Sequence, residues 1–147
     1  YRKAKENQKQ RYFFPLNQET NFKINKFFRI ITRGKKNLPK ILNIKGRNFE
    51  IKNFYEGISR FNFQELCDQN LGAEDYLEIA KISNLIVIEN VPQQRFITLL
   101  DVIYDKNTPI AITANQSIDK FTSSRSLEQE FKRSISRLYE LTSMNYK

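Results

Sequence analysis

Two arginines near the end of the chain, Arg133 and Arg137, have the spacing best suited to chemistry in this sequence. They lie four positions apart in an amphipathic segment, and side chains so spaced project from the same face of an α-helix. Two neighbouring guanidinium groups can hold a phosphate or pair with carboxylates. The pattern therefore indicates either an anion-binding face or a solvated polar face, and Arg95 has the same two interpretations.

The sequence lacks the loop that usually holds a nucleotide phosphate. Its four glycines, at positions 34, 46, 57 and 72, never form the pattern G-x-x-x-x-G-K-[ST]. Glu89 follows the apolar residues 85–88 in the way that an acidic residue ends a Walker B strand, where a carboxylate holds Mg²⁺. Without a phosphate-binding loop, we interpret Glu89 as structural or solvated. We therefore predict no catalytic residue and no metal site in these 147 residues.

Residue types exclude several other chemistries. The chain has no histidine, so it cannot form Ser-His or Cys-His nucleophile pairs and lacks the commonest metal ligand. Its single cysteine, Cys67, excludes an internal disulfide and is predicted to be a small buried hydrophobe. No apolar run approaches the roughly 20 residues that span a bilayer as a helix.

Positive charge is concentrated at the start of the chain. Residues 1–47 carry 14 Lys/Arg and 2 Asp/Glu, a net charge of +12, whereas residues 48–147 carry 11 and 14, a net of −3. Such a segment suits a nucleic acid, an anionic membrane or an acidic protein, with weak, salt-sensitive binding. The alternative is compositional drift, since the chain is rich in Lys, Asn and Ile together. The predicted basic surface consists of Lys23, Lys26, Lys35, Lys36 and Lys40.

The first third of the chain must position this charge. Residues 1–11 are polar and basic, which predicts a solvated helix or a tail. Residues 12–16 predict a short strand that ends at a proline, although their three aromatic rings could also stack on bases. Residues 17–31 have helical periodicity, and Gly34 is a plausible stop. The apolar stripe predicted for this helix is Phe22, Phe27, Phe28 and Ile31.

The middle of the chain alternates between strand and helix patterns. Residues 41–51 predict a β-hairpin that turns near Gly46. An alternating strand at 58–63 precedes a short helix at 64–69, and a second helix follows at 73–81. The side chains predicted to face inward from this second helix are Tyr76, Leu77 and Ala80.

The last third has the pattern of a parallel α/β unit. Residues 85–88 and 109–114 predict buried strands, and residues 94–105 predict the helix between them. A short helix at 118–121 and an amphipathic helix at 127–144 follow. Strand, helix and strand in succession favour a right-handed crossover between parallel strands. The predicted fold class is therefore α/β, with this unit preceded by a mixed α+β segment that carries the hairpin.

Five segments resemble, in order, parts of the ZapE (Afg-one-like) family of AAA+-type P-loop ATPases. They are RFNFQELC at 60–67, LGAEDYLEIA at 71–80, VP at 91–92, RFITLLDVIYD at 95–105 and FKRSISRLYEL at 131–141. The resemblance is dense from residue 58 onward and thinner before it. Three departures stand out: Glu89-Asn90 replaces an acidic pair, Leu141 replaces a methionine, and only Gln93 and Gln94 separate the VP and RF segments.

The resemblance implies what the rest of such a protein contains. The family's phosphate-binding loop, Walker B segment and sensor-one strand are expected before Tyr1, so ATP and Mg²⁺ are cofactors of the full-length protein and this fragment is expected to be inactive alone. Residues 1–147 are then a single C-terminal domain or fragment, with a basic α+β segment at 1–57 and an α/β segment at 58–147.

The resemblance also implies partners. These are the N-terminal P-loop part of the same protein and a cell-division or membrane-protein partner, in the cytoplasm or peripheral at the inner membrane. Arg133 is the candidate to face a nucleotide. Arg137 is the candidate for a structural or interface role, such as anchoring Asp75 or Asp101. The alternative function is a basic binding module for nucleic acid, anionic membrane or an acidic protein.

Overall fold

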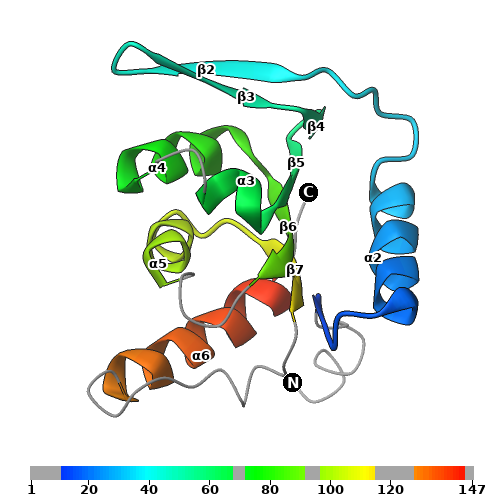
Figure 1. The fold of residues 1–147 in the computed structure, drawn as a ribbon, viewed down its shortest axis with the longest axis vertical. Helices are drawn as coiled ribbons and strands as arrows, with labels where there is room; N and C mark the ends of the chain where they lie inside the picture. The colour runs from blue at the N-terminus through cyan, green and yellow to red at the C-terminus, as the bar shows by residue number, and fades with distance from the viewer. Residues whose placement is uncertain (1–10, 68–71, 92–96, 115–127, 145–147) are drawn as a thin grey trace.

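The computed structural model describes residues 11–67, 72–91, 97–114 and 128–144 of the chain. After β1 and one helix come four successive strands, the first two of which form a β-hairpin; two helices and then an alternation of strands and helices follow (Figure 1). The strands are β1 (Tyr12–Phe13), β2 (Lys40–Ile44), β3 (Arg47–Ile51), β4 (Asn53–Tyr55), β5 (Ile58–Asn62), β6 (Leu85–Val91) and β7 (Ile110–Ala114). The helices are α2 (Gln18–Ile31), α3 (Phe63–Cys67), α4 (Ala73–Ile82), α5 (Ile97–Asp105) and α6 (Glu128–Ser143).

Five strands form one sheet in the order β1-β7-β6-β5-β4. All neighbours pair in parallel except β4, which pairs antiparallel with β5 at one edge. The predicted parallel strands β6 and β7 are direct neighbours, with Val87 opposite Ala111, and α5 connects them. The predicted α/β fold class and its crossover unit are therefore confirmed. The sequence had not predicted β4.

The order of the strands explains which helices cover which face. Parallel strands are joined by right-handed crossovers. The chain steps from β5 to β6 to β7 in one direction, so α3, α4 and α5 lie on the same face (Figure 1). The path from β1 to β5 crosses the sheet in the opposite direction, so α2 lies on the other face. We call these two surfaces of the sheet the four-helix face, which α6 also covers, and the α2 face.

Most of the apolar core lies on the four-helix face. Ile86 and Ile88 of β6 contribute to it, as do Leu100 of α5 and Leu138 of α6, and all four are at most 1% exposed. The hairpin packs on the same cluster through its inward residues Leu42, Ile44, Phe49 and Ile51. Because strand residues alternate between faces, Leu85 and Val87 point the other way, into the smaller cluster beneath α2.

Helix α2 begins and ends close to the predicted bounds. Asn17 caps its first turn, since the Asn17 Oδ1 atom accepts a hydrogen bond from the Thr20 N–H at 2.8 Å. The predicted apolar stripe is wrong at Phe22, which is 63% exposed, whereas Ile24 is fully buried. Ile24, Phe28 and Ile31 lie at helical spacing and face the sheet. Phe22 is two positions before Ile24, so it points to the opposite side of the helix.

The hairpin turns where the sequence predicted. Lys45 and Gly46 both have positive φ, 52° and 81°, between the paired residues Ile44 and Arg47. Two consecutive residues with positive φ form the two-residue turn that matches the twist of a β-hairpin. Glycine adopts this conformation without steric cost, so Gly46 favours the turn at this position.

The predicted strand at 58–63 ends one residue early because a helix cap intervenes. The Asn62 side chain accepts a hydrogen bond from the Gln64 N–H, and Glu65 in turn accepts one from the Asn62 N–H at 3.0 Å. Because of this reciprocal capping, α3 begins at Phe63. Phe63 is therefore buried as the first residue of a helix and not as the last residue of the strand. In α4, Tyr76 and Leu77 are only half-buried, whereas Asp75 and Ile79 are buried.

Arg11 contradicts the prediction that residues 1–11 are solvated. It is 6% exposed, and its guanidinium donates hydrogen bonds to the carbonyl oxygens of Ile110, Leu141 and Met144. Carbonyl groups at the end of a helix lack partners within the helix, and a cation near them is favourable. Arg11 therefore joins the start of β1 to the end of α6. Residues 1–10, and the short helix predicted at 118–121, lie outside the described residues.

Candidate functional site

Polar side chains meet on the α2 face near the carboxyl ends of β5 and β6. The Arg60 Nε atom donates to the Glu89 Oε1 atom at 2.6 Å, and the Arg60 Nη2 atom donates to the Asn25 Oδ1 atom at 2.6 Å. The Arg60 guanidinium also lies 4.6 Å from the centre of the Phe28 ring. We call Asn25, Phe28, Arg60 and Glu89 the Arg60 cluster. In open α/β sheets, this end of the strands is where ligands usually bind.

Strand register brings these residues together. Arg60 lies opposite Val87, and Glu89 is two residues further along β6 on the same face. The ion pair is largely shielded, with 19% of the Arg60 side chain and 21% of the Glu89 side chain exposed. Glu89 therefore has a structural partner. The sequence reasoning missed Arg60, because its partner could be identified only once β5 and β6 were known to pair.

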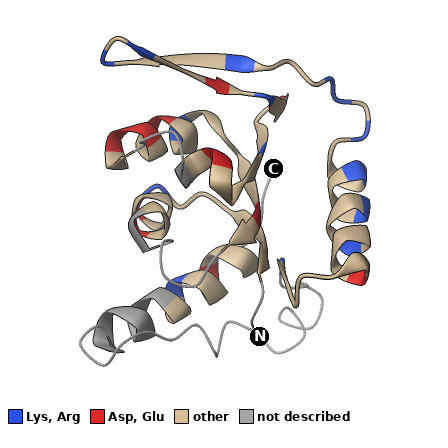
Figure 2. Ribbon diagram, in the orientation of Figure 1, with Lys and Arg blue, Asp and Glu red and all other residues tan. Residues whose placement is uncertain are grey.

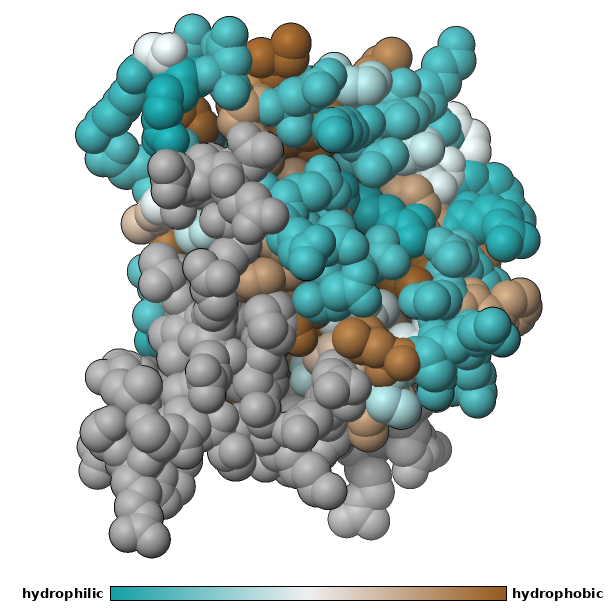
Figure 3. Space-filling view, in the orientation of Figure 1, coloured by the Kyte–Doolittle hydropathy of each residue, from teal (hydrophilic) through white to brown (hydrophobic). Residues whose placement is uncertain are grey.

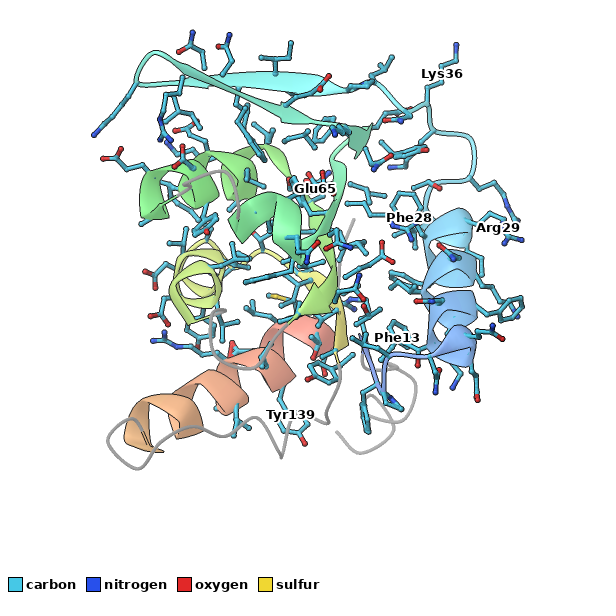
Figure 4. The ribbon with its side chains drawn as sticks, in the orientation of Figure 1. Phe13, Phe28, Arg29, Lys36, Glu65 and Tyr139 are labelled. Carbon is cyan, nitrogen blue, oxygen red and sulfur yellow. The ribbon has the colours of Figure 1, made fainter. Side chains whose placement is uncertain are left out.

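An open pocket of about 500 Å³ adjoins this cluster, between α2 and the strands β4 and β5. Its lining residues are Asn25, Phe28, Arg29, Thr32, Asn53, Tyr55 and Arg60. The Tyr55 ring meets the Phe28 ring edge-on at 5.1 Å, and the Thr32 hydroxyl donates to the Phe28 carbonyl oxygen. Figure 4 shows Phe28 directed toward the sheet and Arg29 directed away from it. The pocket thus has a polar and aromatic lining, but the Arg29 charge is not aimed into it.

The outer side of α2 is strongly basic. Lys23 and Lys26 lie on the helix and Lys35 and Lys36 follow it, while Lys40 begins the hairpin (Figure 2). Figure 2 also shows that acidic residues are concentrated on the helices of the opposite face. The predicted basic residues therefore lie along α2 and the segment that leads to β2. The face turned to the viewer in Figure 3 is mainly hydrophilic, with apolar side chains in small separate groups.

The arginines singled out on α6 lie across the sheet from this basic surface. Arg137 donates a hydrogen bond to the Asp101 carboxylate of α5, and its guanidinium lies 4.6 Å from the centre of the Tyr104 ring. It therefore joins α5 to α6. Arg133 belongs to α6, but its side chain, and with it the predicted shared face of the two guanidinium groups, lies outside the described residues. Arg95 also lies outside them.

Asp75, the other carboxylate considered for Arg137, has different partners. It accepts a hydrogen bond from the Gly72 N–H at 2.8 Å at the start of α4, and it pairs with Arg47 of the hairpin at 3.0 Å. Its side chain is only 4% exposed. Arg47 therefore fastens the hairpin to α4 through this buried carboxylate. Lys45 adds a second, exposed pair to the same helix through Glu74, at 2.8 Å.

The residues present do not fit a magnesium nucleotide. The whole sequence lacks the glycine-rich loop whose backbone N–H groups would surround the phosphates. Within residues 11–67, 72–91, 97–114 and 128–144, no three carboxylate, cysteine or histidine side chains are grouped closely enough to share a cation. No phosphate-transfer step is therefore assigned to these residues.

Among the same residues, no helix is both long and apolar enough to cross a membrane.

Comparisons with known proteins give a family. A family model described as AFG1-like ATPase matches residues 1–147. Cell division protein ZapE of Escherichia coli strain K12 is 24% identical over 141 residues, which cover 90% of this chain and 38% of that protein. Lactation elevated protein 1 homolog B of Danio rerio is 37% identical over 91 residues, covering 56% of this chain and 18% of that protein. No solved structure matches the chain significantly.

Proposed function

This chain belongs to the AFG1-like ATPase family, and from that membership we propose that it is the C-terminal portion of an ATP hydrolase. The chain spans 38% or less of the length of these two relatives. One observation carries the proposal: the family match covers every residue, yet the sequence contains no phosphate-binding loop. In this proposal ATP and Mg²⁺ bind the N-terminal P-loop part of the protein, and the present chain acts as its attached α/β module.

The proposal assigns different roles to the two arginines of α6. Arg137 is a structural residue, because it already pairs with Asp101 and stacks on Tyr104. Arg133 is the candidate to approach the nucleotide, in the same chain or across a subunit interface, where a positive charge would stabilise the transferring phosphoryl group. ATP hydrolysis would then be coupled to a cell-division or membrane-protein partner. The name of the E. coli relative, a cell division protein, supports the first of these.

Phosphate release from Mg²⁺-ATP tests the ATPase proposal. We expect no turnover from the chain alone and clear turnover from the full-length protein. In the full-length protein, Arg133→Ala should fold normally but lose on the order of 10²–10³ in turnover. Arg137→Ala is the matched control and should keep its rate. Turnover by the chain alone that survives further purification, or an unchanged rate in the Arg133→Ala protein, would contradict the respective assignment.

We propose a second activity, binding of polyanions by the basic segment, because its lysines lie along α2 and the following residues (Figure 2). Such binding should be weak and should fall steeply as salt rises, since it depends on release of counterions. Fluorescence anisotropy with a short labelled DNA at two salt concentrations measures this. An affinity that does not change with salt concentration would show that charge is not the cause of binding. No binding even at low salt would favour compositional drift as the origin of the lysines.

A further inference from the structure

The outer side of α2 combines positive charge with exposed apolar side chains. We define the α2 outer face as Phe22, Lys23, Lys26, Arg29 and Ile30, which point away from the buried stripe of the helix. Phe22 is 63% exposed and Ile30 is 53% exposed. Their helical positions interleave them with the three cations, because residues three and four apart are neighbours on a helix.

The cations of this face are poorly neutralised. Lys23 has an exposed pair with Glu19 at 3.4 Å, one turn earlier. Among the described residues, no ion pair involves Lys26 or Arg29. By contrast, Arg60 of β5, which lies beneath the inner side of this helix, is paired with Glu89. The outer face therefore presents positive charge that an external anion can approach without breaking a described ion pair.

Exposed apolar side chains are concentrated in the same part of the chain. Among the described residues, seven large apolar side chains are exposed, and six of them lie between Phe14 and Ile41. These six are Phe14, Leu16, Phe22, Ile30, Leu38 and Ile41; the seventh, Tyr139, is on α6. Thus the stretch with exposed apolar groups is also the basic stretch. Charge alone does not explain this coincidence, because a purely electrostatic surface gains nothing from isoleucine or leucine.

The chemistry of this face distinguishes between anionic partners. A nucleic acid would use aromatic rings to stack on bases, and Phe22 is the one ring of the α2 outer face. A helical protein partner would need a groove, and the described pocket lies on the inner side, against β4 and β5. α2 stands at the outside of the molecule as a single helix (Figure 1). Basic and apolar side chains together on such a helix suit the interface of a membrane.

We propose that the α2 outer face binds the surface of an anionic lipid bilayer, with Lys26 and Arg29 meeting the headgroups while Phe22 and Ile30 enter the interface. This inference rests on the proposed polyanion binding and deepens it by assigning the anion. Electrostatic attraction would bring the chain to the surface, and burial of the two apolar side chains would hold it there. Binding would orient the molecule with the four-helix face directed away from the bilayer.

Sedimentation with vesicles tests this proposal on the whole chain. Vesicles of phosphatidylcholine containing about one-third phosphatidylglycerol should bind the chain, and pure phosphatidylcholine vesicles should not. The double variant Lys26→Gln/Arg29→Gln should weaken binding roughly 30-fold, since each basic residue near the surface contributes about fivefold. The matched control Lys81→Gln/Lys106→Gln removes the same charge from exposed positions beside the four-helix face and should leave binding unchanged.

A second pair of variants separates insertion from attraction. Phe22→Ser/Ile30→Ser should weaken vesicle binding at least about fivefold while binding to a short DNA stays the same. Ile41→Ser is the control, because Ile41 is 64% exposed on the hairpin but outside the α2 outer face. Equal vesicle binding by the Phe22→Ser/Ile30→Ser variant would overturn the lipid assignment. DNA binding without vesicle binding would also overturn it and leave polyanion binding intact, whereas binding to neither would overturn both.

Discussion

In the part of the chain that the structure describes, one face of the five-stranded sheet lies under four helices and a β-hairpin, whereas α2 alone covers the other. Among the described residues, 20 buried apolar side chains form the cluster on the four-helix face and 6 form the cluster beneath α2. The α2 face holds the open pocket and the basic surface. The difference indicates that the four-helix face carries most of the described apolar core, whereas the α2 face is covered more thinly and carries the surface proposed to bind partners.

A pair of phenylalanines provides the strongest test of this difference. Phe61 points into the four-helix face, is 2% exposed and stacks on Phe49, whereas Phe28 is 8% exposed beneath α2. We expect Phe61→Ala to lower the free energy of unfolding by about 4 kcal/mol and Phe28→Ala by about 3 kcal/mol, because a single covering helix can settle into the cavity more easily. Urea denaturation followed by circular dichroism measures both. An equal or larger loss at Phe28 would show that the α2 face is not the weaker one.

Arg11 tests how the start of the chain is tied to the four-helix face. Its three hydrogen bonds to carbonyl groups span 2.6–3.0 Å and reach the last turn of α6. Arg11→Met should lower the free energy of unfolding by about 3 kcal/mol, because it leaves carbonyl groups without a donor. Arg33→Met replaces an exposed arginine and should change stability by less than about 0.5 kcal/mol. If both substitutions lowered the free energy of unfolding by the same small amount, the hydrogen bonds of Arg11 would not be needed for stability.

Two ion pairs, one on each face, allow a closer comparison. Arg60 and Arg137 are similarly shielded, at 19% and 21% side-chain exposure, and each stacks 4.6 Å from an aromatic ring centre. Their carboxylate partners differ, because the Glu89 side chain is 21% exposed and that of Asp101 is 48% exposed. Arg60→Ala should therefore cost about 2 kcal/mol of stability and Arg137→Ala about 1 kcal/mol.

Double-mutant cycles would separate these pairs from the packing around them. The cycle of Arg60→Ala with Glu89→Ala should give a larger coupling energy than the cycle of Arg137→Ala with Asp101→Ala, and urea denaturation supplies both. A larger coupling for the Arg137 pair would reverse the expected order of the two faces. It would also show that exposure of the carboxylate does not govern the strength of these pairs.

The smallest expected effect concerns the pH dependence of the four-helix face. Burial raises the pKa of the Tyr12 phenol, and the nearby Tyr139 raises it further. The folded chain therefore keeps this proton more tightly than the unfolded chain, so its contribution to stability is complete below about pH 10 and is lost as pH rises beyond that. As pH rises from about 9.5 to about 10.5, the free energy of unfolding should fall by about 0.7 kcal/mol less in the Tyr12→Phe variant than in the wild type.

Urea denaturation at these pH values checks the Tyr12 prediction. Tyr139→Phe removes only the smaller of the two causes, so its pH dependence should lie closer to that of the wild type. Identical pH dependence of the wild type and Tyr12→Phe would show that Tyr12 is not a determinant of alkaline stability.

Local patterns were sufficient for most elements. The β-hairpin, the helices α2, α4 and α6, and the parallel pair β6 and β7 all follow from spacing of apolar residues and from turn residues such as Gly46. Such signals succeed because a helix or a turn is stabilised by residues close in sequence. The family resemblance was likewise visible in short segments such as residues 60–67, and the family match bears it out.

The candidate site was less predictable. The basic residues of α2 were identified from charge alone, but the Arg60 cluster was not, since its members come from positions 25, 28, 60 and 89. Arg133 and Arg137 were singled out for their spacing. That spacing says nothing about Asp101, which pairs with Arg137 from another helix. A side chain's role as an ion-pair partner depends on distances in space that the sequence does not contain.

The sequence by itself determined where most helices and strands form, which residue types are available and where positive charge is concentrated. Tertiary structure alone decided that β1 pairs with β7, that Phe22 faces outward while Ile24 is buried, and that Arg11 is buried while Arg33 is exposed. The physical reason is that local propensities act over a few residues, whereas burial and pairing depend on which surface the sheet presents to each element. Right-handed crossovers determined on which face each helix lies, so α2 is the one described helix on its face.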